Sequence, residues 1–204
     1  MNFKAWFVAG RHFALPWILF NALFAVVLAG FSLPAFLYSF GIAYLTLVAG
    51  HYVNDFRDFE KGLDKVEGGS VAKGYTGAST VIPTGALSVK AAKLSAVGFL
   101  LAGFALLVLR AITAGISIET AALYAFGVFI SLTYTDLFKP HGLPDLAIAL
   151  GHGAAVTLFS YSMIAPINMT AVTAAIVLGL FGATLAVIDQ YPDAKSSAVE
   201  KAKG

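Results

Sequence analysis

The sequence predicts an all-α fold, a polytopic transmembrane helical bundle with six spanning helices. Of its 204 residues, 59% are hydrophobic and only 12% are charged, which is about half the charged share of an average soluble domain. The apolar residues form long blocks rather than amphipathic stripes, as in helices surrounded by lipid. The basic residues gather between alternate blocks, which is the pattern that encodes membrane topology.

Six apolar segments approach the roughly 20 residues that a helix needs to cross a bilayer. They are 13–31, 33–53, 94–109, 120–134, 146–164 and 170–188. The third and fourth are short, so we expect both to extend toward Arg110 and Glu119 at the far surface. Pro16, Pro34 and Pro144 stand near helix starts, where a missing N–H costs least.

Positive charge is divided very unevenly between the two sides of this bundle. Twelve of the 13 Lys and Arg residues fall on the side that holds the termini, and Arg110 stands alone on the other. The positive-inside rule makes the rich side cytoplasmic. We therefore expect an integral protein of a prokaryotic-type cytoplasmic membrane with both termini in the cytoplasm. The lipid bilayer is its partner, and we expect no nucleic-acid partner.

The first motif is the segment NDFRDFEKGLDK, which follows the second apolar segment. Spacings of three and four put Asn54 and Asp58 on one helical face with Asp55 beside them. Gly62 can end the helix and let Asp64 turn back toward the same point. Converging carboxylates repel one another unless a cation lies among them. A hard divalent cation such as Mg²⁺ is the natural one, because its ligands are oxygens. Cysteine is absent, which excludes disulfides and thiolate metal sites.

The second motif, DQYPD, follows the sixth apolar segment on the same side of the membrane. Asp189 and Asp193 are four residues apart, which suits one face of a helix end. Two facing carboxylate sets could hold two or more Mg²⁺ ions and neutralise a diphosphate. A single aspartate beside a spanning helix is usually solvated loop charge. Five aspartates in two spaced sets favour function instead.

These motifs resemble those of the UbiA superfamily of intramembrane prenyltransferases, and the resemblance runs from Arg11 to Lys203. The NDxxDxxxxxD spacing is similar to the menaquinone-type branch, which prenylates dihydroxynaphthoate; the commoner form has its last aspartate where Gly62 stands here. The second motif matches the family's second aspartate-rich motif. Further similarity lies in YTGAST (75–80) and in the stretch from Tyr134 through Lys139 to HGLPD (141–145).

The resemblance implies Mg²⁺-dependent transfer of a polyprenyl group from an allylic polyprenyl diphosphate to an aromatic quinone precursor similar to dihydroxynaphthoate. Apart from these two substrates, Mg²⁺ is the cofactor expected. The catalytic and metal-binding residues would be Asp55, Asp58, Asp64, Asp189 and Asp193. The substrate-binding residues would be Asn54, Arg11, Tyr134 and Lys139. Arg11 and Lys139 fit ordinary positive-inside anchoring equally well.

Two histidines each allow a structural interpretation as well as a functional one. His51 stands four residues before Asp55 and could orient it, although a polar cap on the helix end is the favoured interpretation. His152 lies between two glycines in the fifth apolar segment. A polar group there should face the bundle interior. We interpret it first as a structural residue of close helix packing and second as a cavity residue.

The chain departs from the family pattern in three ways. Ser197 stands where a third acidic residue is often found, and TVIPTGALS (80–88) lacks an obvious cation before the third helix. Family members usually have nine spanning helices. We therefore expect residues 1–204 to form one domain that lacks the last three helices. Either a truncated reading frame or a minimal homologue that completes its bundle as a homo-oligomer would explain this.

Two other functions remain open at this point. The aspartates could be ion ligands of a cation transporter or channel, or the chain could be a non-catalytic prenyltransferase fragment. Transport sites usually lie near the bilayer midplane, whereas both acidic sets here lie at the cytoplasmic edge.

We predict that reporter fusions placed after Arg110 and after Gly204 report opposite sides of the membrane, because the cations are so unevenly divided. A phosphatase and a fluorescent-protein reporter at each position would measure this. The same side at both positions would contradict the topology and, with it, the shared mouth of the two motifs.

Overall fold

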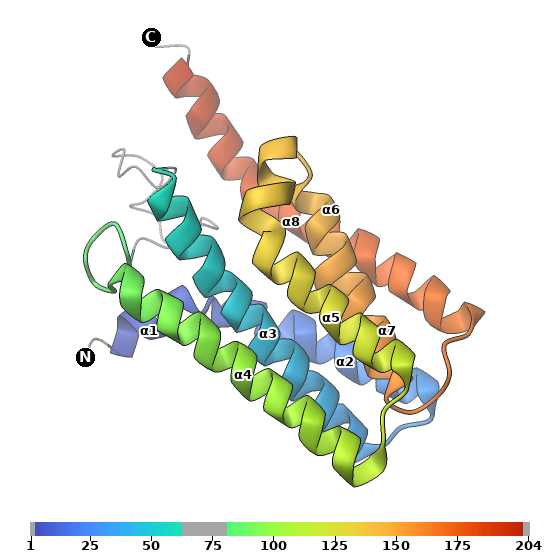
Figure 1. The fold of residues 1–204 in the computed structure, drawn as a ribbon. Helices are drawn as coiled ribbons and strands as arrows, with labels where there is room; N and C mark the ends of the chain where they lie inside the picture. Colours follow the sequence, from blue (N-terminus) through green and yellow to red (C-terminus); the bar gives the residue numbers. More distant parts are fainter. Residues whose placement is uncertain (1–2, 63–80, 202–204) are drawn as a thin grey trace.

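The structure is a computed structural model that describes residues 3–62 and 81–201; for residues 13 and 189–201 it describes the backbone alone. Within these ranges the chain is helical, without strands (Figure 1). The long helices are α2 (Leu15–Ala29), α3 (Leu33–Glu60), α4 (Val89–Ala114), α5 (Ile118–Thr133) and α8 (Met169–Lys201). The polytopic helical bundle predicted from the sequence is confirmed.

Short helices complete the bundle. They are α1 (Phe3–Ala9), the 3₁₀ turns η1 (His12–Ala14) and η4 (Lys139–His141), the π-helical turn η3 (Tyr134–Phe138), α6 (Pro144–Ile148), the π-helical segment η5 (Ala149–Ala155) and α7 (Val156–Ser162). Helices α6, η5 and α7 follow one another without a break, so the fifth predicted segment is helical as far as Ser162.

Each of the six apolar segments predicted from the sequence falls in a helical region. Four helical stretches are long and apolar enough to cross a membrane: Leu33–Glu60, Val89–Ala114, Ile118–His141 and Met169–Ile188. Leu15–Ala29 is a shorter apolar helix. The third and fourth segments extend toward the far end as expected, and there Arg110 donates hydrogen bonds to the carbonyls of Gly115 and Met163.

Helix boundaries follow local capping rules. Ser32, Ser88 and Ser117 precede α3, α4 and α5, and each hydroxyl accepts a hydrogen bond from the backbone amide three residues later, which satisfies one otherwise unpaired N–H. Prolines stand in the first turn of α2, α3 and α6, as the sequence predicted. Helix α3 ends at Glu60 with Lys61 as its C-cap, and Gly62 after it takes a positive φ of 67°.

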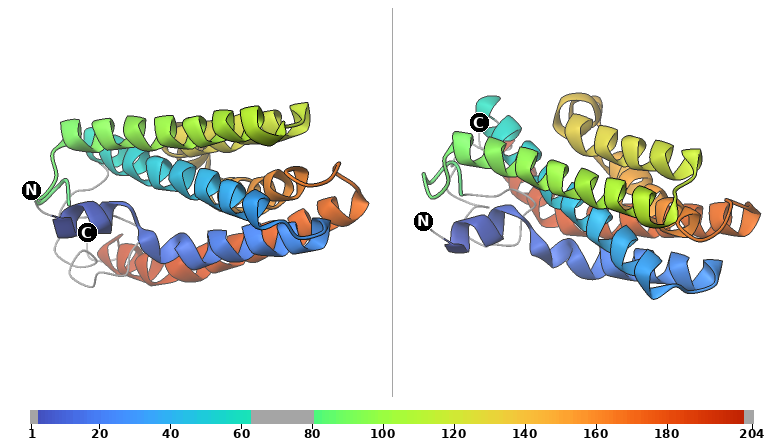
Figure 2. Two further views of the ribbon diagram at one scale, coloured as in Figure 1. Left: turned by 90° about the horizontal axis from the view of Figure 1, so that it is seen from below. Right: turned by 60° about the horizontal axis from the view of Figure 1, so that its bottom comes forward.

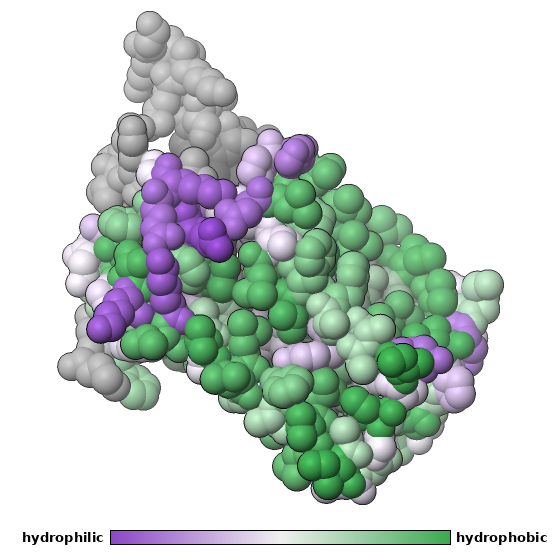
Figure 3. Space-filling view, viewed as in Figure 1, coloured by the Kyte–Doolittle hydropathy of each residue, from purple (hydrophilic) through white to green (hydrophobic). Residues whose placement is uncertain are grey.

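The helices pack so that several chain segments meet at one end of the bundle. Helix α4 packs along α3, α2 packs on α7, and α8 packs on η5. In Figure 2, α3 and α4 lie on one side of the bundle and α2 and α8 on the other. Helix α1 and the C-terminal ends of α3 and α8 share one end (Figures 1 and 2). Hydrophilic residues gather at this end, and the body is mostly hydrophobic (Figure 3).

A close backbone approach joins η5 to α8. A Cβ added at Gly153 would lie 2.4 Å from Gly179 Cα and 2.8 Å from Leu178 O. Glycines allow such contact because they have no side chain. The sequence interpretation that the glycines beside His152 serve close helix packing is therefore confirmed.

We predict that Gly153→Ala destabilises the protein by about 1–3 kcal/mol, because the new methyl group can be accommodated only if two backbones separate. Thermal unfolding in detergent would measure the loss. Gly98→Ala is the matched control, since a Cβ there meets nothing within 4 Å and alanine favours a helix. Equal melting temperatures for the two variants would contradict the close contact.

Candidate functional site

The last two turns of α3 carry three buried polar side chains into the hydrophilic end of the bundle. Asn54, Asp55 and Asp58 are 5%, 2% and 3% exposed. As their spacing predicted, α3 continues through all three. The helix holds all three at fixed heights and angles, with Asn54 and Asp58 one turn apart. Two carboxylates buried this close to one another require compensating charge.

Arg11 supplies the first compensating charge. Its Nη2 lies 2.6 Å from Asp55 Oδ1, and the guanidinium is only 12% exposed. The residue has a left-handed backbone with φ 47° and ψ 48°, and no other non-glycine residue in the described ranges has positive φ. That conformation costs roughly 1–2 kcal/mol, which a buried charge-assisted hydrogen bond can offset.

Lys139 supplies the second compensating charge. Its Nζ lies 2.6 Å from Asp58 Oδ2, and the side chain is 35% exposed against 4% for Asp58. Helix α5 passes into the π-helical turn η3 and then into η4, which begins at Lys139. The π-helical turn η3 followed by the 3₁₀ turn η4 places this residue at the end of α3, where it pairs with Asp58.

Asn54 links the two ion pairs. With its amide oxygen turned toward Arg11, that oxygen accepts hydrogen bonds from Nη1 and Nη2 at 3.2 and 3.1 Å. The amide nitrogen then donates to Asp58 Oδ2 at 3.1 Å and to Thr135 Oγ1 at 2.7 Å. This orientation pairs both ends of the amide, so the two carboxylates, two cations and one amide form a continuous network.

Two residues of this region were not predicted from the sequence. Thr135 is fully buried against Asn54. Asp136 pairs with Arg57 at 3.1 Å and with Lys61 at 2.6 Å, so these three side chains form an ion-pair group. In the sequence, these two residues could have been identified as the polar pair that ends the apolar run of α5, one turn before Lys139.

Tyr134, which was predicted to bind substrate, begins the same π turn and packs on Ile130, Phe138 and Ala147.

A small, partly open apolar pocket of about 40 Å³ lies in the body of the bundle. Helices α2, α3, α5 and α7 and the segment η5 line it, and its polar lining residues are Thr46, Tyr124, Ser131 and His152. The helical rise of 1.5 Å per residue puts Thr46 about 18 Å from Asp58 along α3. His152 is thus a cavity residue as well as a neighbour of the packing glycines.

His51 has a different role from either sequence interpretation. It lies inside α3, not at a helix end, and its Nδ1 is 2.9 Å from the carbonyl oxygen of Gly10. Its ring meets that of His152 edge-on, with centroids 6.3 Å apart. His51 therefore contacts the turn before Arg11.

The oxygen ligands that the structure describes provide only part of a site for a hard cation. Three of the predicted ligands are missing from them: Asp64 lies outside the described residues, and for Asp189 and Asp193 only the backbone is described. The backbone of the latter two lies in α8, which ends at the same end of the bundle as α3 (Figure 1). Among the described residues no three His, Asp or Glu side chains converge on one point. Asp58 Oδ1 is buried and has no hydrogen-bond partner in the described part, as suits an oxygen ligand.

The comparison with known proteins agrees with this architecture. The family model described as the UbiA prenyltransferase family matches residues 5–200, which is nearly the whole chain. No curated protein and no solved structure gives a significant match. The match covers the bundle, both acidic segments and the two cations that pair with the first of them. The chain belongs to the UbiA prenyltransferase family and is a membrane enzyme that transfers prenyl groups.

Proposed function

We propose that this protein transfers a polyprenyl group from an allylic polyprenyl diphosphate to an aromatic quinone precursor, with Mg²⁺ as cofactor. One observation carries the proposal: two buried carboxylates pair with two cations at one end of a bundle whose body holds an apolar pocket. A polyprenyl diphosphate has the same division, with a highly charged head and a long hydrocarbon tail. The head would lie at the network, and the tail would extend toward the cavity.

Arg11 and Lys139 would change partners when substrate binds. Without substrate each cation neutralises one carboxylate at 2.6 Å. A diphosphate offers several anionic oxygens, and a guanidinium can bind two of them at once. Lys139 is more exposed than Arg11, so its ammonium can follow the incoming head group with less rearrangement.

Asp55 and Asp58 would hold Mg²⁺ together with Asp64, Asp189 and Asp193. Mg²⁺ typically takes one or two carboxylates and completes its shell with water and substrate phosphate. Bound there, the ion would supply positive charge that stabilises the leaving diphosphate as the C–O bond breaks. Asn54 would keep its amide contacts to Asp58 and to Arg11.

The apolar walls would protect the reaction from water. Loss of diphosphate leaves an allylic cation, and water would convert it to an alcohol. The cavity lining includes Tyr124 and Phe159 beside aliphatic side chains, and aromatic faces stabilise positive charge. The acceptor's electron-rich ring would attack the allylic carbon and then restore its aromaticity by losing the group, such as a proton, that the new bond displaces. Tyr134 is proposed to contact the substrates.

The acceptor class rests on the spacing of the first motif, which resembles the menaquinone-type branch. Purified protein supplied with Mg²⁺, a set of prenyl diphosphates and a panel of aromatic acceptors would test it. Turnover of dihydroxynaphthoate-like acceptors above hydroxybenzoate-like ones would support the assignment, and the reverse would overturn it. Cation transport is disfavoured, because the described carboxylates lie in the last two turns of α3, away from the middle of the bundle.

We predict that Asp58→Asn weakens Mg²⁺-dependent diphosphate binding by about a hundredfold or more, since losing one partner of a buried charge group costs about 3–5 kcal/mol. Asp193→Asn should have a similar effect. Calorimetry with farnesyl S-thiolodiphosphate, which resists ionisation, would measure the Kd. Glu60→Gln is the matched control, because Glu60 is exposed and pairs with Lys93 instead.

Two results would count against this site. Undiminished binding of the analogue in excess chelator would exclude Mg²⁺ from head-group recognition. Binding by either asparagine variant at the wild-type Kd would remove that aspartate from the site.

We predict that Lys139→Gln tightens the binding of Mn²⁺ alone, on the order of tenfold for each 1.4 kcal/mol of competing ion pair removed, while it weakens binding of the diphosphate analogue. The opposite signs follow because Lys139 competes with the metal for Asp58 but attracts the diphosphate. Spin-resonance titration with Mn²⁺ would measure the first effect. Lys61→Gln, whose ammonium pairs with Asp136, should change neither. Weaker Mn²⁺ binding in Lys139→Gln would contradict the exchange of partners.

A further inference from the structure

The turn between α1 and η1 is attached to one face of α3 through consecutive residues. Along α3, His51 and Asp55 are four residues apart and therefore share a face. They contact Gly10 and Arg11, which are adjacent in the chain: His51 Nδ1 reaches Gly10 O at 2.9 Å, and Asp55 Oδ1 reaches Arg11 Nη2 at 2.6 Å. One contact thus holds the backbone of the turn and the other holds its side chain.

The turn needs such support because of its backbone. Arg11 is left-handed with φ 47°, a conformation that side chains other than glycine rarely adopt. A Cβ at Gly10 would lie 2.5 Å from the ring of His12, so a side chain there would require this ring to move. The turn is therefore tight, and a small rotation of the Gly10 carbonyl would redirect the guanidinium that follows it.

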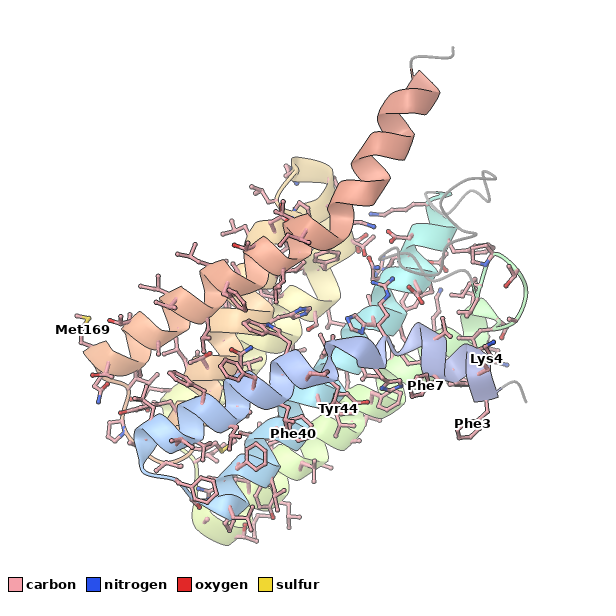
Figure 4. The ribbon with its side chains drawn as sticks, turned by 180° about the vertical axis from the view of Figure 1, so that it is seen from behind. Phe3, Lys4, Phe7, Phe40, Tyr44 and Met169 are labelled. Atoms are coloured by element: carbon pink, nitrogen blue, oxygen red, sulfur yellow. The ribbon has the colours of Figure 1, made fainter. Side chains whose placement is uncertain are left out.

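The neighbouring contacts show which part of the segment from α1 to η1 His51 holds in place. The Tyr52 hydroxyl donates to the carbonyl of Trp6 at 2.9 Å, and the ring of His12 bonds the Tyr44 hydroxyl. These contacts hold α1 and η1 on either side of the turn. Figure 4 shows α1 beside α3, with Phe3 directed away from the bundle. Among the described contacts, only that of His51 reaches the carbonyl directly before Arg11.

We infer that His51 is a positioning residue that sets the direction of Arg11 toward the diphosphate by donating a hydrogen bond from Nδ1 to the Gly10 carbonyl. A carbonyl can only accept, so Nδ1 carries the hydrogen. The role does not require His51 to touch substrate. The inference rests on the proposed function, in which Arg11 binds the head group.

Binding of farnesyl S-thiolodiphosphate with Mg²⁺, measured by calorimetry in nanodiscs, tests this role without turnover. His51→Phe and His51→Ala, which lack the donor, should each raise the Kd about tenfold or more, because a misdirected group loses most of its interaction. His51→Asn places an N–H near the position of Nδ1 and should stay within about twofold of wild type. Tyr52→Phe, which loosens α1 without touching Gly10, should also stay within about twofold.

A double-mutant cycle separates this role from a general structural one. In an Arg11→Gln background, His51→Ala should raise the Kd less than about twofold further, because both changes remove the same interaction. Additive effects, or equal losses in Tyr52→Phe and His51→Ala, would overturn the inference. So would wild-type Kd values in the donor-lacking variants. If His51→Phe and His51→Ala both unfold, the test is His51→Asn. A His51→Asn variant that melts at the wild-type temperature but binds the analogue more weakly than wild type would then overturn the inference.

The outcomes also separate this inference from the proposed function. If wild-type protein does not bind the analogue, the proposed function fails. If wild type binds and Arg11→Gln weakens binding, while His51 variants bind normally, only the role of His51 fails.

Discussion

Burial of negative charge at the end of α3 is the constraint on which the arrangement of this site depends. Two carboxylates that are almost inaccessible to solvent cannot stay ionised without nearby positive charge. The chain meets this demand from both directions: Arg11 comes from the turn that precedes the first apolar helix, and Lys139 comes from the turns that follow α5. Segments that are distant in sequence therefore have to end at the same place, and the mouth of the bundle is built by their convergence.

The ion pairs also explain why this end of the bundle combines order with reactivity. A carboxylate pair neutralised by side chains is stable enough to persist without substrate. The same pair can accept other cations, because the side chains that neutralise it can turn to a new anion. Burial strengthens each attraction by lowering the local dielectric. A network of this kind favours ligands that bring positive and negative charge together, as a metal diphosphate does.

Hydrophobic blocks and cation placement were enough to predict the bundle, because lipid forces spanning segments to be helical and apolar. The pairing of aspartates at helical spacing likewise identified the part of the site that lies on one continuous helix. Residues that depend on irregular backbone could not be predicted in this way. The left-handed turn at Arg11 and the π-helical turn with Thr135 and Asp136 have no period, so their neighbours across the bundle became known only from the structure. His51 was misinterpreted for the same reason, because its partner is a backbone carbonyl.

The crossing of Gly153 and Gly179 has a consequence for the far end of α8. Ten residues at 1.5 Å per residue separate Gly179 from Asp189, so the backbone of Asp189 lies about 15 Å up the helix from the crossing. Helix α8 also packs on α2, α6 and α7, so these neighbours fix the direction in which the helix continues. A substitution that separates the two backbones at the crossing would therefore also displace the acidic end of α8 relative to the end of α3.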